Sequence, residues 1–433
     1  MLDRRVPEPA AGQTHAAVIP GLRLVWRRGE TALKWAAVVL GCSVPVSVFV
    51  DNVLLYVLLT FFLVGGAYRD KLASIRGNPV AWLAVALWGL FAIGSLYSIG
   101  TRQEVIDGLG KAARLLLIPV LVYLLREPIW RERGLAGFVA SMLVALVLSW
   151  LLWLGVVPGN NWIKGSPLDP AVFKAHNTHN VFMAFAAFLI AQVALEAKSL
   201  RARIALWLVC AAAVANVLLM VPGRTGIIAL LVLFVYFLAR TLKGRGLAIA
   251  GAALAVLAVI VLASPESMLH RRITLADEEF AQWRAGIPPE PTSSVGLRLE
   301  YLENTLSIIG RNPVIGVGTG GFGKAYAERV SGTGAETTHN PHNEVLLLLV
   351  QFGVVGFALF AALLVTQWRL AARLPSAFDV GAARAFVLTA GVTSLLSSML
   401  LDHAEGFFFA YMSGLLFAGY RSGAPDITRQ RSS

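Results

Sequence analysis

Long apolar stretches follow one another along most of this chain, and short polar segments separate them. A helix of about 17 to 25 apolar residues is long enough to cross the hydrocarbon core of a bilayer. The stretches, such as Ala136 to Val157, are continuous and lack the alternation of apolar and polar residues found in the strands of membrane barrels. The pattern therefore predicts an all-α, polytopic membrane protein.

The apolar windows predict about twelve membrane-spanning helices. Several windows are short for a full crossing, which indicates tilted neighbours or local thinning of the bilayer. The predicted spans are residues 32–49, 53–67, 80–98, 112–125, 136–156, 178–197, 204–221, 225–239, 246–263, 343–366, 382–401 and 405–420.

Composition and charge fit this topology. Hydrophobic residues make up 57% of the chain and charged residues 14%. Lys and Arg gather in alternate connections and at both ends of the chain, and such segments face the cytoplasm. Both termini are therefore predicted to be cytoplasmic. The net charge of +12 follows largely from this arrangement and from attraction to anionic lipids, so it does not indicate a nucleic-acid partner.

The predicted topology divides the chain into five parts. The connection before the tenth span is the one outer segment long enough to form a lobe of its own. The parts are a basic cytoplasmic tail at residues 1–31, nine transmembrane helices at 32–263, a large outer lobe at 264–341, three transmembrane helices at 342–420 and a second cytoplasmic tail at 421–433.

The outer lobe contains one predicted helix and one glycine-rich loop. Apolar residues recur at helical spacing from about Val295 to Gly310, which predicts an amphipathic helix lying on the membrane or roofing a cavity. Residues 316–321 fit the pattern G-x-G-x-x-G, but no strand precedes them, so a dinucleotide-binding turn is not expected. We interpret this loop as a flexible approach to a site.

The polar stretch Thr337 to Glu344 leads directly into the apolar segment Val345 to Val365. Polar groups at a membrane boundary are costly, which makes this stretch a candidate site. Asn340 is predicted to cap the helix, with Pro341 at its first position and His342 in its first turn. A helix N-terminus disfavours the imidazolium, so His342 is expected to stay neutral and accept a proton.

His339 is the second candidate for the proton acceptor. It lies one residue outside the predicted cap, where a purely structural histidine is an equally good interpretation. For His342 the structural alternative is a hydrogen bond to a neighbouring loop.

A second outer helix start lies at Pro222-Gly223-Arg224-Thr225-Gly226. This connection is so short that Arg224 must lie at the membrane surface, beside the exposed N–H groups of the next helix. Those donors and a bidentate guanidinium would suit a phosphate or diphosphate. The alternative is an arginine that extends to lipid headgroups.

Two further features have simpler interpretations. His176 and His179 share an H-x-x-H spacing with His339 and His342, and four imidazoles could form a zinc site. Nothing in the sequence brings the pairs together, so we expect neither a metal ion nor another cofactor. The outer segment from Asp402 to Glu405 could touch a substrate, but a solvated surface turn is the favoured interpretation.

The motifs together resemble the bacterial O-antigen ligase family, part of a superfamily that also holds O-antigen polymerases. His342-Asn343, nine further residues and Gly353-Val354-Val355-Gly356 fit the signature H-N-x9-G-x-x-G. Arg298 and Tyr301, followed by Asn312 to Gly318, are similar to an Arg-led helix and its Pro- and Gly-rich turn. Many members have Trp where this chain has Tyr301. Arg224 matches the arginine of a short outer loop.

The resemblance implies a GT-C-like membrane glycosyltransferase of lipopolysaccharide biosynthesis, located in the bacterial inner membrane with its active site facing the periplasm. The donor would be O-antigen linked to undecaprenyl diphosphate, and the acceptor a sugar hydroxyl of lipid A-core. His342, with His339 in reserve, would be the base, while Arg224 and Arg298 would bind the diphosphate without a metal ion. Inversion at the anomeric carbon would follow.

Two other functions stay open. An O-antigen polymerase would use the same donor but extend a second lipid-linked glycan. A transporter would need broken helices or repeated halves around a site at mid-membrane. No internal repeat is visible, and the polar cluster lies at the outer boundary, so transport is the weaker alternative.

Overall fold

The computed structural model describes residues 20–160, 162–242, 244–246, 251, 268–285 and 295–420. All regular elements within these residues are helices, which confirms the all-α prediction. In chain order they are α1 (Pro20–Ser43), α2 (Val48–Val64), α3 (Tyr68–Arg76), α4 (Pro79–Gly94), α5 (Arg102–Ala112), η1 (Ala113–Leu116), α6 (Leu117–Leu124), α7 (Pro128–Trp153), α8 (His176–Glu196), α9 (Leu200–Ala215), η2 (Asn216–Met220), α10 (Arg224–Thr241), α12 (Met268–Arg284), α13 (Gly296–Arg311), α14 (Phe322–Val330), α15 (Glu344–Ala371), α16 (Ala377–Leu396) and α17 (His403–Phe417).

Six of the described helices are long and apolar enough to cross a membrane: α7, α8, α9 continued by η2, α10, α15 and α16. The pair α2 and α3, bent by 115°, would make seven if it counts as one span. The full set of twelve therefore stays a prediction, and most of its ninth member, residues 246–263, lies outside the described residues. The window predicted at 112–125 is helical, as η1 followed directly by the eight-residue helix α6, and its crossing of a membrane stays a prediction.

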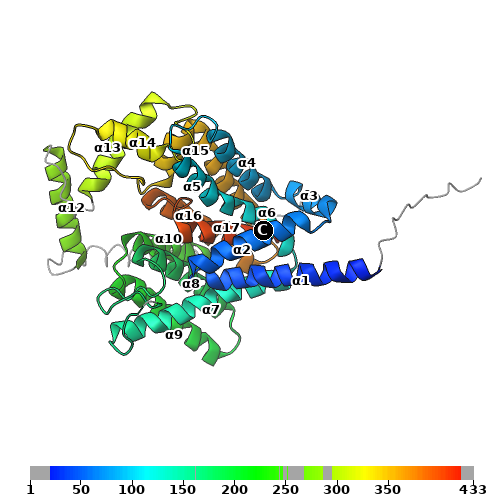
Figure 1. Ribbon diagram of the computed structural model, residues 1–433. Coiled ribbons are helices and arrows are strands. Elements are labelled where there is room, and N and C mark those ends of the chain that lie inside the picture. Colours follow the sequence, from blue (N-terminus) through cyan, green and yellow to red (C-terminus); the bar gives the residue numbers. More distant parts are fainter. Residues whose placement is uncertain are drawn as a thin grey trace, which may run out of the picture.

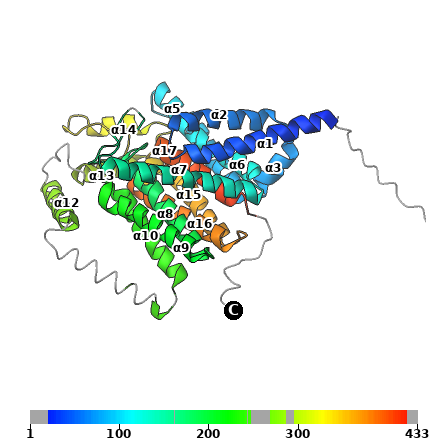
Figure 2. The same cartoon turned by 90° about the horizontal axis from the view of Figure 1, so that it is seen from below.

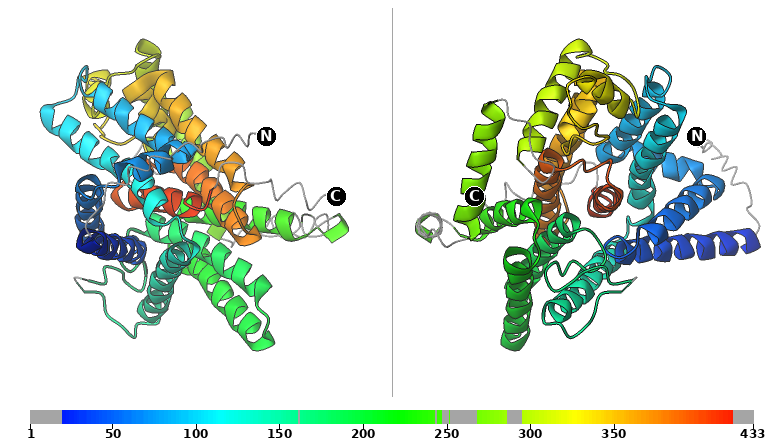
Figure 3. Two further views of the ribbon diagram at one scale, coloured as in Figure 1. Left: turned by 90° about the vertical axis from the view of Figure 1, so that its right-hand side faces the viewer. Right: turned by 60° about the vertical axis from the view of Figure 1, so that its left-hand side comes forward.

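Two helices form the centre of the bundle. Every residue of α17 after His403 is buried, and so is most of α8. Their aromatic rings meet, with Phe182 stacked on Phe408 at a centroid distance of 4.6 Å and Phe138 beside both. Around this centre, α8 packs on α9 and α10, α1 on α7, and α15 on α4 and α16 (Figures 1 and 3). The short α17 is thus an internal helix, shielded from lipid by its neighbours.

Helices α13 and α14 pack on one end of α15. Helices α13 and α14 contact each other and the start of α15, whereas α12 lies at the edge of the molecule, beside α13 (Figures 1 and 2). The amphipathic helix expected at 295–310 is confirmed as α13. Its buried residues include Thr305 and Ile308, and Ile308 joins a small core with Phe322, Tyr326 and Leu347.

The long helix α15 is interrupted at Gly353, the first glycine of the G-x-x-G motif. Gly353 has φ 59° and ψ −155°, a conformation open essentially to glycine alone. The loop 312–318 fills the break. Val354 N donates to Pro313 O at 2.9 Å, and Val317 N donates to Val350 O at 2.8 Å. Non-helical backbone inside a membrane bundle requires such pairing, because lipid offers no partners.

The glycine-rich loop expected to be flexible is instead docked on the bundle, so that prediction is wrong. Gly318 N donates to Gln351 O at 2.8 Å, and Gly320 N donates to the Gln351 side chain at 2.6 Å. A Cβ on Gly318 would lie 2.5 Å from the Cα of Ser98, so the absence of side chains permits backbone-to-backbone packing. The glycines provide close approach here, not freedom of movement.

Candidate active site

The helix that follows the histidine motif begins later than the sequence suggested. Its N-cap is Asn343, whose side chain accepts from Leu346 N at 3.0 Å. The assignment of Asn340 as cap and Pro341 as first helical residue is therefore wrong, and His342 lies just outside the helix. The Asn340 side chain instead turns back on the loop, where it accepts from His342 N at 2.8 Å.

His342 has a left-handed backbone, with φ 52°. In a residue other than glycine this conformation costs about 1–2 kcal/mol. Asn340 holds it in place, and Ser398 Oγ donates in turn to Asn340 Oδ1 at 2.6 Å. A strained, well-supported residue at a polar boundary is typical of functional sites.

The ring of His342 lies between an aromatic group and two charges. It stacks on Tyr301 at a centroid distance of 6.3 Å and an interplanar angle of 28°. Partial burial and the positive charge of Arg298 hold the pKa of His342 below its ordinary value, while Asp402 acts in the opposite direction. The neutral imidazole is thus favoured, as expected, although burial and Arg298 are the causes and not a place in the helix.

The two predicted arginines lie near each other although they come from different elements. Arg298 is half-buried on α13, and Arg224 is the exposed first residue of α10. Burial and the charge of Arg224 both lower the pKa of Arg298, so the two arginines interact electrostatically. Two neighbouring cations favour the binding of an anion, and guanidinium groups suit the oxygens of a diphosphate.

The turn before Arg224 is fixed by a buried asparagine of α8. Asn180 Nδ2 donates to Val221 O at 2.9 Å. Gly226 follows so closely that a Cβ there would lie 2.2 Å from the Cβ of Asn180. The small residues of the motif thus allow α10 to pack closely on α8, with Arg224 exposed at the first position of α10. We call Arg224, Arg298 and His342 the arginine–histidine surface.

His339 does not belong to that surface. Its side chain is 81% exposed, and Nδ1 lies 3.5 Å from Glu104 Oε1 on α5. Gly323 makes room for the pair, since a Cβ there would lie 2.3 Å from His339 Nδ1. Burial of Glu104 opposes its ionisation, but hydrogen bonds from Thr101 and the charge of His339 outweigh this effect and lower the pKa of Glu104.

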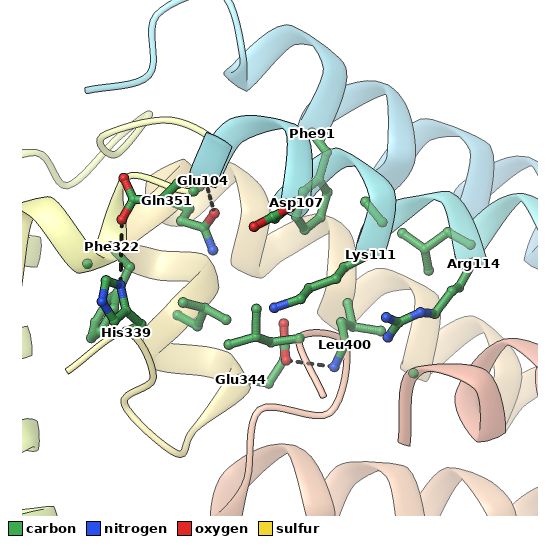
Figure 4. A pocket seen from close by; sticks show the side chains of 18 residues that line it. Phe91, Glu104, Asp107, Lys111, Arg114, Phe322, His339, Glu344, Gln351 and Leu400 are labelled. Atoms are coloured by element: carbon green, nitrogen blue, oxygen red, sulfur yellow. Dashed lines mark hydrogen bonds and ion pairs between the residues drawn. The ribbon is translucent and has the colours of Figure 1, made fainter. Parts of the chain in front are cut away.

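Beside His339 lies a cavity of about 320 Å³, enclosed by α5, the start of α14, the start of α15 and the connection from α16 to α17 (Figure 4). We call it the carboxylate cavity. Its polar lining consists mainly of Glu104, Asp107, Lys111, Arg114, His339 and Glu344.

Sequence reasoning missed the contribution of α5 to this cavity. Glu104, Asp107 and Lys111 follow one another at intervals of three and four residues, which places them on one face of the helix. That spacing, directly after the capping box of Thr101 and Glu104, was the available signal.

Asp402 lies between the surface and the cavity. Its pKa is raised by burial, while the charges of His342, Lys111 and Arg114 act in the opposite direction. Ser397 Oγ donates to Asp402 Oδ2 at 3.0 Å, and Arg114 donates to the main-chain oxygen of Asp402 at 2.8 Å. The interpretation of this segment as a solvated turn is wrong, because Asp402 is only half-exposed and the segment ends in a buried helix.

The two H-x-x-H pairs face different partners. His179 is buried and its Nε2 lies 3.0 Å from Asn216 Oδ1, while His176 pairs with Asp169 at 3.2 Å. His339 pairs with Glu104 instead. Within the part of the chain that the structure describes, no three His, Cys, Asp or Glu side chains are grouped closely enough to hold a metal ion.

These features define a helical membrane protein with a polar site at one end of its bundle. Residues 209–361 match the family model described as O-Antigen ligase, a range that includes Arg224, Arg298 and the complete histidine motif. Over these residues the match supports the resemblance to the O-antigen ligase family. The family consists of membrane glycosyltransferase-like enzymes, both ligases and polymerases, of lipopolysaccharide biosynthesis. No curated protein matches the chain.

Proposed function

We propose that the protein is an O-antigen ligase of GT-C-like fold. It transfers a glycan from undecaprenyl diphosphate to a sugar hydroxyl of lipid A-core, on the periplasmic face of the bacterial inner membrane, with both termini in the cytoplasm. The observation that carries the proposal is the convergence of Arg224, Arg298 and His342 from three separate segments. The family match adds independent support.

The arginine–histidine surface provides the two functions that such a transfer needs. The donor diphosphate binds to Arg224 and Arg298, which stabilise the negative charge that grows on the leaving phosphate. His342 removes the proton from the acceptor hydroxyl as its oxygen bonds to the anomeric carbon. The bond to the diphosphate breaks, and undecaprenyl diphosphate departs with the electron pair. Attack from the opposite face inverts the anomeric carbon, and two fixed cations serve where other enzymes use a metal ion.

His342 is the better choice of base within the histidine motif. It is held between Tyr301 and Arg298, and its lowered pKa keeps a lone pair available at neutral pH. His339 is largely exposed and directed at Glu104, so we assign it to the cavity instead.

Reconstituted transfer tests this proposal. Purified protein in proteoliposomes receives undecaprenyl-diphosphate-linked glycan together with either lipid A-core or a second lipid-linked glycan, each with and without EDTA. Product on lipid A-core that persists in EDTA is the expected result. Product only on the second lipid-linked glycan would make the protein a polymerase. Transfer that EDTA abolishes would contradict the metal-independent mechanism.

A further inference from the structure

The chemistry proposed above uses the arginine–histidine surface and leaves the carboxylate cavity without a function. The cavity volume of about 320 Å³ lies at the lower end of small-molecule sites, which span roughly 300–1,000 Å³. It is large enough for a small ligand or one residue of a polymer. Three carboxylates, a lysine and an arginine open into it, together with Phe91, Phe322 and Leu347. A few convergent polar groups within an apolar wall are characteristic of a specific binding site.

The direction of the side chains supports a binding role. Asp107 and Lys111 extend from α5 toward the middle of the cavity, and Glu344 faces them from the start of α15 (Figure 4). Glu344 is 1% exposed and accepts from Leu400 N at 2.8 Å, so its position is fixed. Burial and the charge of Arg114 lower the pKa of Lys111. Polar side chains directed at one enclosed space present both hydrogen-bond acceptors and a donor to a ligand.

The charges indicate what kind of ligand fits. Glu104 and Asp107 offset the charges of Lys111 and Arg114, so the cavity offers a diphosphate no excess of positive charge. Sugar hydroxyls are well suited, because each can donate to a carboxylate and accept from Lys111. The ring C–H groups of a sugar can pack on Phe91 and Phe322. The donor diphosphate and a hydroxyl-rich ligand therefore belong on different sides of Asp402.

We propose that the carboxylate cavity binds a sugar residue of the acceptor glycan, next to the hydroxyl that His342 deprotonates. This inference rests on the proposed function. Its location supports it, because Asp402 interacts electrostatically with His342 on one side and with Lys111 and Arg114 on the other. The cavity wall and the support of His342 also share one segment: Ser398 contacts Asn340, and the neighbouring Leu400 and Leu401 line the cavity. An acceptor held in the cavity would be held beside the base.

Steady-state kinetics with two variants of α5 test the proposal. Asp107→Asn and Glu104→Gln each replace a charged acceptor by a neutral one of similar shape, and glutamine preserves the capping box. Hydrogen bonds to charged groups are among the stronger ones, so we expect a roughly tenfold rise in the KM for the acceptor in the double variant. The KM for the lipid-linked donor should stay unchanged. The acceptor is whichever of lipid A-core and a second lipid-linked glycan the wild-type protein uses.

A matched control separates the cavity from the general charge of the lobe. Glu328 is an exposed carboxylate on α14 that does not line the cavity. Glu328→Gln should leave both KM values at the wild-type level. An unchanged acceptor KM in the double variant would overturn the proposal, and so would a rise confined to the donor KM, because the cavity would then hold the donor glycan.

Direct binding distinguishes failure of this inference from failure of the proposed function. The probe is the acceptor oligosaccharide with its lipid removed, titrated into the purified full-length protein by calorimetry. Binding by the wild type that weakens about tenfold in the double variant supports the cavity even if no transfer is seen. Equal binding by both proteins, or none by the wild type, contradicts it even if transfer to lipid A-core succeeds.

Discussion

The arginine–histidine surface and the carboxylate cavity lie on either side of Asp402, yet they differ in charge and in enclosure. The first presents two guanidinium groups, one of them exposed, and the second gathers three carboxylates around a partly open cavity. A diphosphate suits the first, whereas the second offers it no excess of positive charge. The difference suggests that charge sorts donor and acceptor to opposite sides of one base.

His342→Ala should have the largest effect, because it removes the base that we propose for both regions. General-base catalysis contributes about 10²- to 10⁴-fold, so transfer should fall by that amount. Initial rates in proteoliposomes measure it, and unchanged thermal unfolding would show that the fold is intact. His339→Ala is the matched control. It should reduce transfer less, and mainly by raising the KM for the acceptor. Near-normal turnover by His342→Ala would contradict the assignment of His342 as the base. It would also contradict the view that the two regions serve one base.

Gly353→Ala tests whether the site depends on the loop 312–318 that docks in the break of α15. The substitution puts a side chain in a conformation that costs about 1–3 kcal/mol, and its Cβ would lie 2.2 Å from the carbonyl carbon of Val314. Thermal unfolding should show a large loss of stability, and transfer should fall. Gly310→Ala on α13 is the control, because a Cβ there meets nothing within 4 Å. Helical alanine should stabilise by about 0.5–1 kcal/mol. Equal behaviour of the two variants would contradict the docked-loop interpretation.

Arg224→Lys tests the surface alone. Lysine keeps the charge but loses the planar fork that binds a diphosphate at two points. We expect kcat/KM for the donor to fall about tenfold, with the acceptor KM unchanged. Arg311→Lys, at the exposed end of α13, is a control that should have no effect. If lysine replaced Arg224 without loss, contact with lipid headgroups would be the better account.

The pH profile gives the smallest and most specific effect. In the proposed mechanism the basic form of His342 is active, so kcat/KM should rise with pH through the pKa of this residue, which lies below its ordinary value. Asp402 raises that pKa and Arg298 lowers it. Asp402→Asn should therefore move the acid limb to lower pH, and Arg298→Gln should move it to higher pH. Shifts in the same direction would contradict the placement of His342 between opposite charges.

The sequence predicted the helical class, helix α13 and the residues of the arginine–histidine surface. These features depend on local periodicity or on short motifs. It misplaced the start of α15, because Asn340 and Asn343 are both acceptable caps and the choice depends on Ser398, far away in the chain. It missed the cavity because α5 and α15 meet only in the folded bundle, and no pattern in one helix reports which other helix it faces.

The break in α15 has a consequence for how the protein can vary. Backbone amides of a membrane helix must find partners, and at Gly353 the partners come from the loop 312–318. The lobe is therefore a structural requirement of the span and not an appendage. Removing the loop would leave these amides without hydrogen-bond partners, so the loop and the broken helix depend on each other. A chimaera between relatives should therefore take the loop 312–318 and the part of α15 around Gly353 from the same parent.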